Sequence, residues 1–154
     1  KIGRIDMAMS VGTMNDLDSL RDLEAVFKGM QRILSKDRFF VFTMETIEGL
    51  TEMGQAPDRI IHEDRDLIVL SRTRYDFERQ VCTIDYDLFE KADAECWRRQ
   101  QAKRVLKAFP IQAVASLLRR HGFEVLKVLN TRLETLDLAM AGAPEVIFFA
   151  KKLE

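Results

Sequence analysis

A glycine and several small polar residues follow a short apolar run near the start of the sequence. The apolar run is Ile5–Val11, and the segment Ser10–Asn15 lies at its end. In open α/β sheets, ligands bind beyond the carboxyl ends of the parallel strands. A glycine at that position lets a ligand approach the backbone closely, because it has no side chain. The same residues fit another interpretation, in which Gly12 makes a strand-to-helix turn and Asn15 helps to cap the helix.

Acidic and aromatic side chains further along form a second group of candidates. Glu45 lies just past a second apolar run and has the chemistry to orient an amine or a hydroxyl group. A solvated loop carboxylate is the alternative interpretation. Tyr75, Tyr86 and Trp97 have rings that could wall a small-molecule site or contact a cation. Packing within a sheet explains each of these three rings as well.

Three arginines have the chemistry to bind a carboxylate through a bidentate pair of hydrogen bonds, namely Arg72, Arg74 and Arg104. Surface solubility is the alternative role for each of them. His62 and His121 have no partner at the spacing of a catalytic pair, and His121 is placed to stabilise the last carbonyl groups of a helix. The sequence therefore assigns no catalytic residue.

The composition is that of a globular domain. The 154 residues are 47% apolar and 32% charged with a net charge of −1, a length typical of one domain and a charge without overall attraction to nucleic acid or anionic lipid. Cys82 and Cys96 have no His or Cys neighbour at metal-ligand spacing, so we expect no metal and a reduced, cytoplasmic setting. No membrane span or signal peptide is expected, and an opening Lys1 indicates a fragment or a processed piece.

Hydrophobic periodicity predicts the elements that position the first candidates. Ile5–Val11 and Phe39–Thr43 are expected to be strands buried on both faces, as in parallel sheets. The helix between them begins after Asp18 or Ser19, and the three elements form a crossover between parallel strands. Thr46–Glu63 lacks periodicity because glycines and a proline interrupt it, so we expect a loop or a frayed helical turn there.

The second half of the sequence predicts an antiparallel hairpin followed by a helix and two strands. Alternating apolar residues indicate that the hairpin has one wet face. Pro110 suits the first turn of the helix, and Gly122 provides its left-handed stop. The remaining expectations are hairpin strands Leu67–Tyr75 and Gln80–Phe89, a further strand Trp97–Leu106, strands Phe123–Leu129 and Glu145–Ala150, and a helical turn around Leu136–Met140.

This order of elements resembles the C-terminal half of class I S-adenosylmethionine-dependent methyltransferases, in particular the small-molecule type related to glycine N-methyltransferase. Ile5–Asn15 resembles the family's fourth strand and the loop after it. Leu34–Phe42 resembles the approach to the fifth strand, with Asp37-Arg38 in place of paired glycines. Further similar stretches are Thr83–Tyr86, Phe109-Pro110, Leu117–Phe123 and Phe148–Lys152. The resemblance covers nearly the whole chain but only the back half of the family domain.

The resemblance implies an α/β fold with a partial Rossmann-like methyltransferase sheet and flanking helices. It also implies a single domain over residues 1–154, in which an antiparallel insertion over residues 64–107 covers the substrate. The implied cofactor is S-adenosylmethionine, with Val11, Gly12 and Thr13 flanking its methionine and sulfonium region. The residues implied on the acceptor side are Met14, Asn15, Glu45, Tyr75, Trp97 and Arg104.

Two parts of the family's cofactor site are absent from these 154 residues: the glycine-rich loop and the acidic residue that holds the ribose. We therefore expect methyl transfer to a small-molecule acceptor, with an incomplete cofactor site in this chain. Ile5–Val11 would then be an exposed sheet edge, which implies a homodimer or pairing with a chain that supplies the first half. The alternatives are a non-catalytic remnant or interaction module that pairs through this edge, and an unrelated α+β ligand-binding domain.

Overall fold

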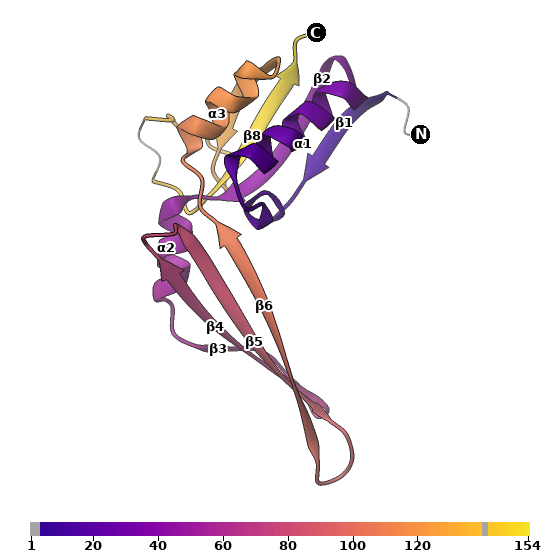
Figure 1. Ribbon diagram of the computed structural model, residues 1–154, viewed down its shortest axis with the longest axis vertical. Helices are drawn as coiled ribbons and strands as arrows, with labels where there is room; N and C mark the ends of the chain where they lie inside the picture. Colours follow the sequence, from indigo (N-terminus) through magenta and orange to yellow (C-terminus); the bar gives the residue numbers. More distant parts are fainter. Residues whose placement is uncertain (1–3, 140–141) are drawn as a thin grey trace. The chain divides into compact units, whose positions relative to one another are not determined.

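The computed structural model describes residues 4–139 and 142–154, and the chain divides into two compact units. The first unit comprises Lys1–Gly49 and Lys107–Glu154, and the second comprises Leu50–Leu106. A mixed sheet with helices forms the first unit, and an antiparallel sheet dominates the second (Figure 1). The expected α/β class with a separate antiparallel insertion is confirmed.

The elements of the first unit are β1 (Ile5–Ser10), η1 (Met14–Asp16), α1 (Leu20–Ile33), β2 (Leu34–Glu45), α3 (Ile111–Arg120), β7 (Phe123–Leu129) and β8 (Glu145–Lys152). Its sheet has the order β1-β2-β8-β7. β1 and β2 run parallel, as the strand–helix–strand pattern predicts. β8 lies antiparallel between β2 and β7, so the last strand in the sequence occupies the middle of the sheet.

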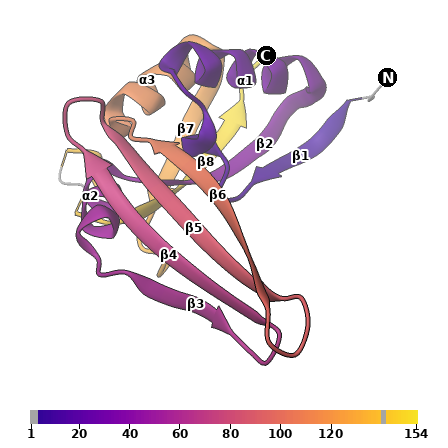
Figure 2. The same ribbon diagram turned by 60° about the horizontal axis from the view of Figure 1, so that its bottom comes forward.

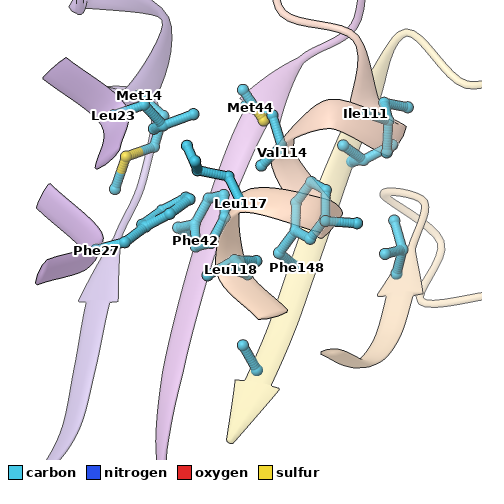
Figure 3. Close-up of a cluster of buried hydrophobic side chains, with 14 of the residues drawn as sticks. Met14, Leu23, Phe27, Phe42, Met44, Ile111, Val114, Leu117, Leu118 and Phe148 are labelled. Carbon is cyan, nitrogen blue, oxygen red and sulfur yellow. The ribbon is translucent and has the colours of Figure 1, made fainter. Parts of the chain in front are cut away.

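One face of this sheet is covered by α1 and α3, which enclose the core with it (Figure 3). α1 begins after Ser19, as expected, because the Ser19 Oγ accepts a hydrogen bond from the Asp22 N–H at 3.2 Å. The ring of Phe27 on α1 lies 5.7 Å from that of Phe42 on β2. Phe42 in turn stacks on Phe148 of β8 at 4.9 Å. These apolar contacts hold the helix layer against the parallel strands.

The opposite face of the sheet carries apolar side chains without a helix from the described part of this unit. Phe39 of β2 and Phe149 of β8 stack there with ring centroids 5.1 Å apart. The expectation that β1 is buried on both faces is wrong: Met7 is 49% exposed and Met9 is 66% exposed. The reason is that β1 is an edge strand paired with β2 only, so its other edge and this face stay open.

β2 begins earlier than the sequence indicates, at Leu34 rather than Phe39. Its pairing with β1 is irregular, since Ile5 lies opposite Leu34 whereas Met7 lies opposite Phe39. The residues between Leu34 and Phe39 are thus part of the strand and form a bulge. Asp37 within it has φ +60°, a left-handed conformation that glycine adopts more readily. This is one of the positions at which the resembling family has glycine.

The second unit contains the antiparallel sheet of order β3-β4-β5-β6 (Figure 2). Its elements are α2 (Ile47–Gln55), which begins in the first unit, β3 (Arg59–Glu63), β4 (Leu67–Asp76), β5 (Val81–Lys91) and β6 (Trp97–Lys107). The expected hairpin and the expected third antiparallel strand are confirmed. The expected wet face is observed too, because Cys82 and Ile84 are buried and Thr83 between them is not.

The expectation of a loop or a frayed helical turn over Thr46–Glu63 is wrong, because this stretch forms the nine-residue helix α2 and then the strand β3. Its glycines are sites of close approach rather than interruptions. A Cβ on Gly49 would lie 2.0 Å from the carbonyl oxygen of Pro144, and a Cβ on Gly54 would lie 2.4 Å from the Cβ of Tyr75. Tertiary contact therefore decides the glycine positions, and periodicity cannot reveal it.

α3 and the last two strands follow the expectations closely. Pro110 precedes α3 directly, and Gly122 has φ +79° just after the helix ends. The connection between β7 and β8 contains a backbone bridge between Leu129 and Thr135. In place of the expected helical turn, residues 136 and 137 have no regular structure and residues 138 and 139 form a turn, and Met140 lies outside the described residues.

Candidate functional site

The loop after β1 is open to solvent and tied to β2. Gly12 has φ +64°, and a Cβ placed on it would meet nothing within 4 Å. Its N–H donates a hydrogen bond to the Thr43 hydroxyl at 3.0 Å. The hydroxyl groups of Ser10 and Thr13 are hydrogen-bonded to each other. Gly12 therefore lies at the carboxyl end of a parallel strand, as the sequence predicts, with open space at its Cβ position, and Val11 beside it is exposed.

Met14 and Asn15 lie in the short η1 turn and point into the protein. Met14 is 4% exposed and belongs to the hydrophobic core, and Asn15 is 3% exposed. The Nδ2 of Asn15 donates to the carbonyl oxygens of Glu45 at 3.0 Å and Lys107 at 2.9 Å. Its Oδ1 accepts the Glu45 N–H at 2.8 Å. Asn15 is thus a backbone clamp rather than a helix cap, and contact with an acceptor remains a prediction for both residues.

Asn15 and Glu45 are brought together by this clamp, with both backbone groups of Glu45 engaged. The Glu45 residue is half-buried at the end of β2. Thr46 follows it, and its hydroxyl donates to the carbonyl oxygen of Ala143 at 2.7 Å while accepting the Gly49 N–H at 3.0 Å. The carboxyl end of β2 is therefore held firmly before α2 begins.

A hollow of about 550 Å³ and another of about 440 Å³ are present in the first unit, and the smaller one adjoins the end of β2. The buried side chains of Phe109 and Ile111 contribute to its lining, and Glu48 and Gln112 contribute polar groups. The Gln112 Nε2 donates to the carbonyl oxygen of Leu138 at 3.2 Å, which links α3 to the facing loop. Local sequence patterns do not reveal this hollow, because residues about 90 positions apart along the chain line it.

Tyr75 is half-buried on one face of the antiparallel sheet. It lies opposite Cys82 of β5, so it shares the face on which Cys82 is buried. Its ring makes an edge contact with Phe77 at 5.0 Å. Burial raises the pKa of the Tyr75 hydroxyl above its ordinary value. Simple packing accounts for these contacts, and a role toward an acceptor remains a prediction.

Trp97 and Arg104 lie on opposite faces of β6. Asp87 points away from the buried face of β5, and Arg99 of β6 donates a hydrogen bond to it, so Arg99 lies on the charged face. Trp97 is two residues from Arg99 and therefore lies on the same charged face. Arg104 is an odd number of residues away and therefore lies on the other face, the face of Tyr75. Seven residues also separate Trp97 and Arg104 by about 23 Å along an extended strand. The structure thus groups Arg104 with Tyr75 by face and separates Trp97 from both.

The charged face of this sheet is neutralised by its own ion pairs. Arg99 lies 2.7 Å from Asp87, and Arg72 lies 2.9 Å from Asp58. Arg74 pairs with Asp85. The hydrogen bond from Arg99, followed by that from Gln101, lowers the pKa of Asp87 below its ordinary value. Arg72 and Arg74, considered above as carboxylate-binding residues, therefore already face carboxylates of the chain itself.

His121 meets the last carbonyls of α3 through its backbone, since its N–H donates to the carbonyl oxygens of Leu117 at 3.2 Å and Leu118 at 3.0 Å, while its side chain contacts a glutamate. Its Nε2 lies 3.0 Å from the Glu24 Oε1, within ion-pair distance but without the alignment of a hydrogen bond. The hydrogen bond from Lys28 lowers the pKa of Glu24, and His121 adds to this effect.

The described residues contain no cluster of three or more metal-ligating side chains. Within them, no helix combines the length and apolarity needed to cross a bilayer.

Comparison of the sequence with protein-family models found no match, and no curated protein matches it. Solved structures match its fold. A S-adenosylmethionine-dependent methyltransferase from Clostridium acetobutylicum has a TM-score of 0.80 at 13% identity, covering 99% of this chain and 60% of that chain. The sugar N-methyltransferase KedS8 from Streptoalloteichus has a TM-score of 0.75 at 17% identity, with 100% and 59% coverage. Streptomyces venezuelae DesVI has a TM-score of 0.73 at 10% identity, with 99% and 60% coverage.

The chain has part of the methyltransferase fold. It spans about 60% of the length of these structures, and at such identities the likeness is one of fold. At the end of β1 there is room for a ligand to approach, because nothing lies within 4 Å of a Cβ placed on Gly12. The carboxylate and the glycine-rich loop that would hold the ribose and the rest of the cofactor are not among these 154 residues.

Proposed function

We propose that this chain is the acceptor-side part of a S-adenosylmethionine-dependent methyltransferase that acts on a small molecule. The observation that carries the proposal is the likeness of fold to such an enzyme, with a TM-score of 0.80 over 99% of the chain. The open loop around Gly12, at the edge of the sheet where ligands bind in α/β folds, gives further support. A relationship to the type of glycine N-methyltransferase is part of the proposal.

Alignment of the acceptor is the main task of the protein in this chemistry. The cofactor's sulfonium supplies an already activated methyl group, so the enzyme needs to position the nucleophile and exclude water. In the proposal, Val11, Gly12 and Thr13 hold the methionine end of the cofactor. Glu45 and the hollow beside it receive the acceptor. The carboxylate of Glu48 in an otherwise largely apolar lining favours an acceptor that carries an amine.

The second unit provides further acceptor candidates. Tyr75 and Arg104 share a face of the antiparallel sheet and combine an aromatic wall with a cation. Trp97 is a separate candidate, because it lies on the other face of β6. Methyl transfer to such an acceptor needs no acid–base pair of the kind that a sequence search would find.

A strand–helix layer is the proposed partner of the open side of the first unit. β1 exposes its unpaired edge, and the sheet face around Met7, Met9, Phe39 and Phe149 has no helix from the described part of this unit. Sheets with parallel strands are ordinarily covered on both faces. The layer would carry the rest of the cofactor site and come from the same protein, from another chain or from a second copy.

Binding of S-adenosylhomocysteine to protein expressed from the complete reading frame tests the proposal by calorimetry. We expect a single site, weakened at least about tenfold by Gly12→Ala, because a methyl group would stand where the cofactor approaches. Gly122→Ala is the matched control, since Gly122 also has a positive φ and an empty surrounding but lies away from the loop. No binding, or equal weakening by both variants, would contradict the proposed function.

An interaction module is the second candidate function. The free edge of β1 and its exposed Met7, Met9 and Val11 favour it, because such an edge pairs readily with another strand. In this case the complete protein would bind a partner chain and not S-adenosylhomocysteine. The calorimetric experiment therefore separates the two candidates.

A further inference from the structure

Asn15 joins the two points at which the chain passes between the units. Glu45 lies at the end of β2, just before α2 carries the chain into the second unit, and Lys107 ends β6, on which it returns. The Asn15 side chain binds the Glu45 backbone through both its oxygen and its nitrogen, and the same nitrogen binds the Lys107 carbonyl oxygen. All three residues belong to the first unit. One amide therefore holds both crossing segments together.

The orientation of the Asn15 amide follows from its partners. Two carbonyl oxygens face Nδ2, and one N–H faces Oδ1. Reversing the amide would set an oxygen against two oxygens and a nitrogen donor against another donor. Both N–H groups of the amide are thus used within the protein. This leaves the side chain better suited to positioning backbone than to binding an acceptor directly.

The segment from Ser10 to Thr13 lies immediately before this clamp. Gly12 is bonded to Thr43, two residues before Glu45, so the loop contacts the end of β2 at two points. The buried side chain of Met14 anchors the turn between these points in the core. A rearrangement of the loop would therefore act on Asn15 through Met14, the one residue between Thr13 and Asn15.

We propose that Asn15 is a positioning residue that couples ligand binding at the Ser10–Thr13 loop to the crossing segments at Glu45 and Lys107. This inference rests on the proposed function for the identity of the ligand. Occupation of the loop stabilises the clamp, and the clamp stabilises the ends of β2 and β6. Replacing Asn15 uncouples the loop from both segments while leaving the residues of the loop in place.

Hydrogen exchange on protein from the complete reading frame tests the coupling, with S-adenosylhomocysteine as the probe. Without the probe, Asn15→Ala should speed exchange of the Glu45 amide by about tenfold or more, since that N–H loses its acceptor. With the probe, the unmodified protein should gain protection around Glu45 and Lys107. Asn15→Ala should lose this gain while still binding the probe at the loop.

Asn130→Ala is the matched control, because the other asparagine of the sequence makes its hydrogen bonds within the turn after β7. It should retain the response of both crossing segments. If Asn15→Ala does not fold, Thr43→Val tests the same coupling from the loop side and should reduce the response at Glu45. Probe binding that leaves the crossing segments unchanged in the unmodified protein overturns the coupling alone. Absence of probe binding overturns the proposed function and with it the coupling, and the two failures are thereby distinguished.

Discussion

The backbone N–H of Gly12 donates to the hydroxyl oxygen of Thr43 at 3.0 Å, so a side chain of β2 holds the loop that follows β1. Thr43→Val keeps the shape of the side chain but removes the acceptor. Losing one such bond costs about 0.5–1.5 kcal/mol. We expect affinity for S-adenosylhomocysteine to fall about three- to tenfold, measured by calorimetry. Thr83→Val in β5 is the control and should leave the affinity unchanged.

Replacement of two helical glycines by alanine should change the stability of the protein in opposite directions. Gly29 in α1 has open space at its Cβ position, so Gly29→Ala should stabilise the protein by about 0.5–1 kcal/mol. Gly49 in α2 would place its Cβ 2.0 Å from the Pro144 carbonyl oxygen, so Gly49→Ala should destabilise it by about 2 kcal/mol or more. Urea unfolding followed by circular dichroism measures both. A stabilising Gly49→Ala would contradict the close contact.

Lys152 holds the end of α1 through its buried amine. The Nζ donates to the carbonyl oxygens of Gln31 at 2.6 Å and Leu34 at 2.9 Å. Lys152→Met should lower the free energy of unfolding by about 1.5–3 kcal/mol, because these are hydrogen bonds from a charged group. Lys151→Met is the neighbouring control, with ion pairs no shorter than 3.6 Å, and should change it by less than about 1 kcal/mol. Equal losses of stability in the two variants would contradict a stabilising role of the Lys152 hydrogen bonds.

The stability of the second unit should depend on pH through the ionisation of Asp87. Arg99 holds the pKa of Asp87 below the ordinary value of 3.8. A carboxylate with a lowered folded pKa stabilises the fold above its unfolded pKa and loses this effect as the pH falls through the folded value. Asp87→Asn should therefore destabilise the unit at pH 7, and this difference should shrink as the pH falls below the ordinary value of 3.8 toward the lower pKa of the folded state. Fluorescence of Trp97, the single tryptophan, follows the unfolding. A difference that stays constant to pH 3 would contradict this prediction.

The open edge of β1 should control association. Met9 is 66% exposed, so Met9→Lys should change the stability of the isolated chain by less than about 0.5 kcal/mol. It should, however, weaken pairing with a second copy or a partner layer, because a charge on an apolar contact surface must be desolvated. Sedimentation velocity at micromolar concentration measures this. A chain that is already monomeric before the change would count against pairing in its present form.

The order and type of the elements could be predicted from the sequence where a single pattern decides them. The helix after Ser19 and the hairpin around Cys82 follow from local periodicity and capping, and both are observed. α2 and β3 were missed because Gly49 and Gly54 were interpreted as interruptions. Glycine is needed at these two positions because Pro144 and Tyr75 lie too close for a side chain, and no local sequence pattern reveals that contact.

The candidate site was predictable only in part, for the same reason. The position of Gly12 at a strand end follows from the apolar run before it, and the structure places it there. The clamp by Asn15 joins backbone groups 30 and 92 residues away, so its partners cannot be identified from spacing. The faces of Trp97 and Arg104 could have been separated by strand parity, which is a signal that the sequence does contain.

The place of β8 in the sheet has a consequence for how the chain folds. The hairpins of the second unit join neighbouring strands and can form early, whereas β2 gains one of its two partners only from residues 145–152, about 100 positions later. Until those residues are synthesised, one edge of the phenylalanine-rich strand β2 has no strand to pair with. Translation that stalls before Glu145 should therefore release a nascent chain that depends on chaperones and aggregates when they are scarce.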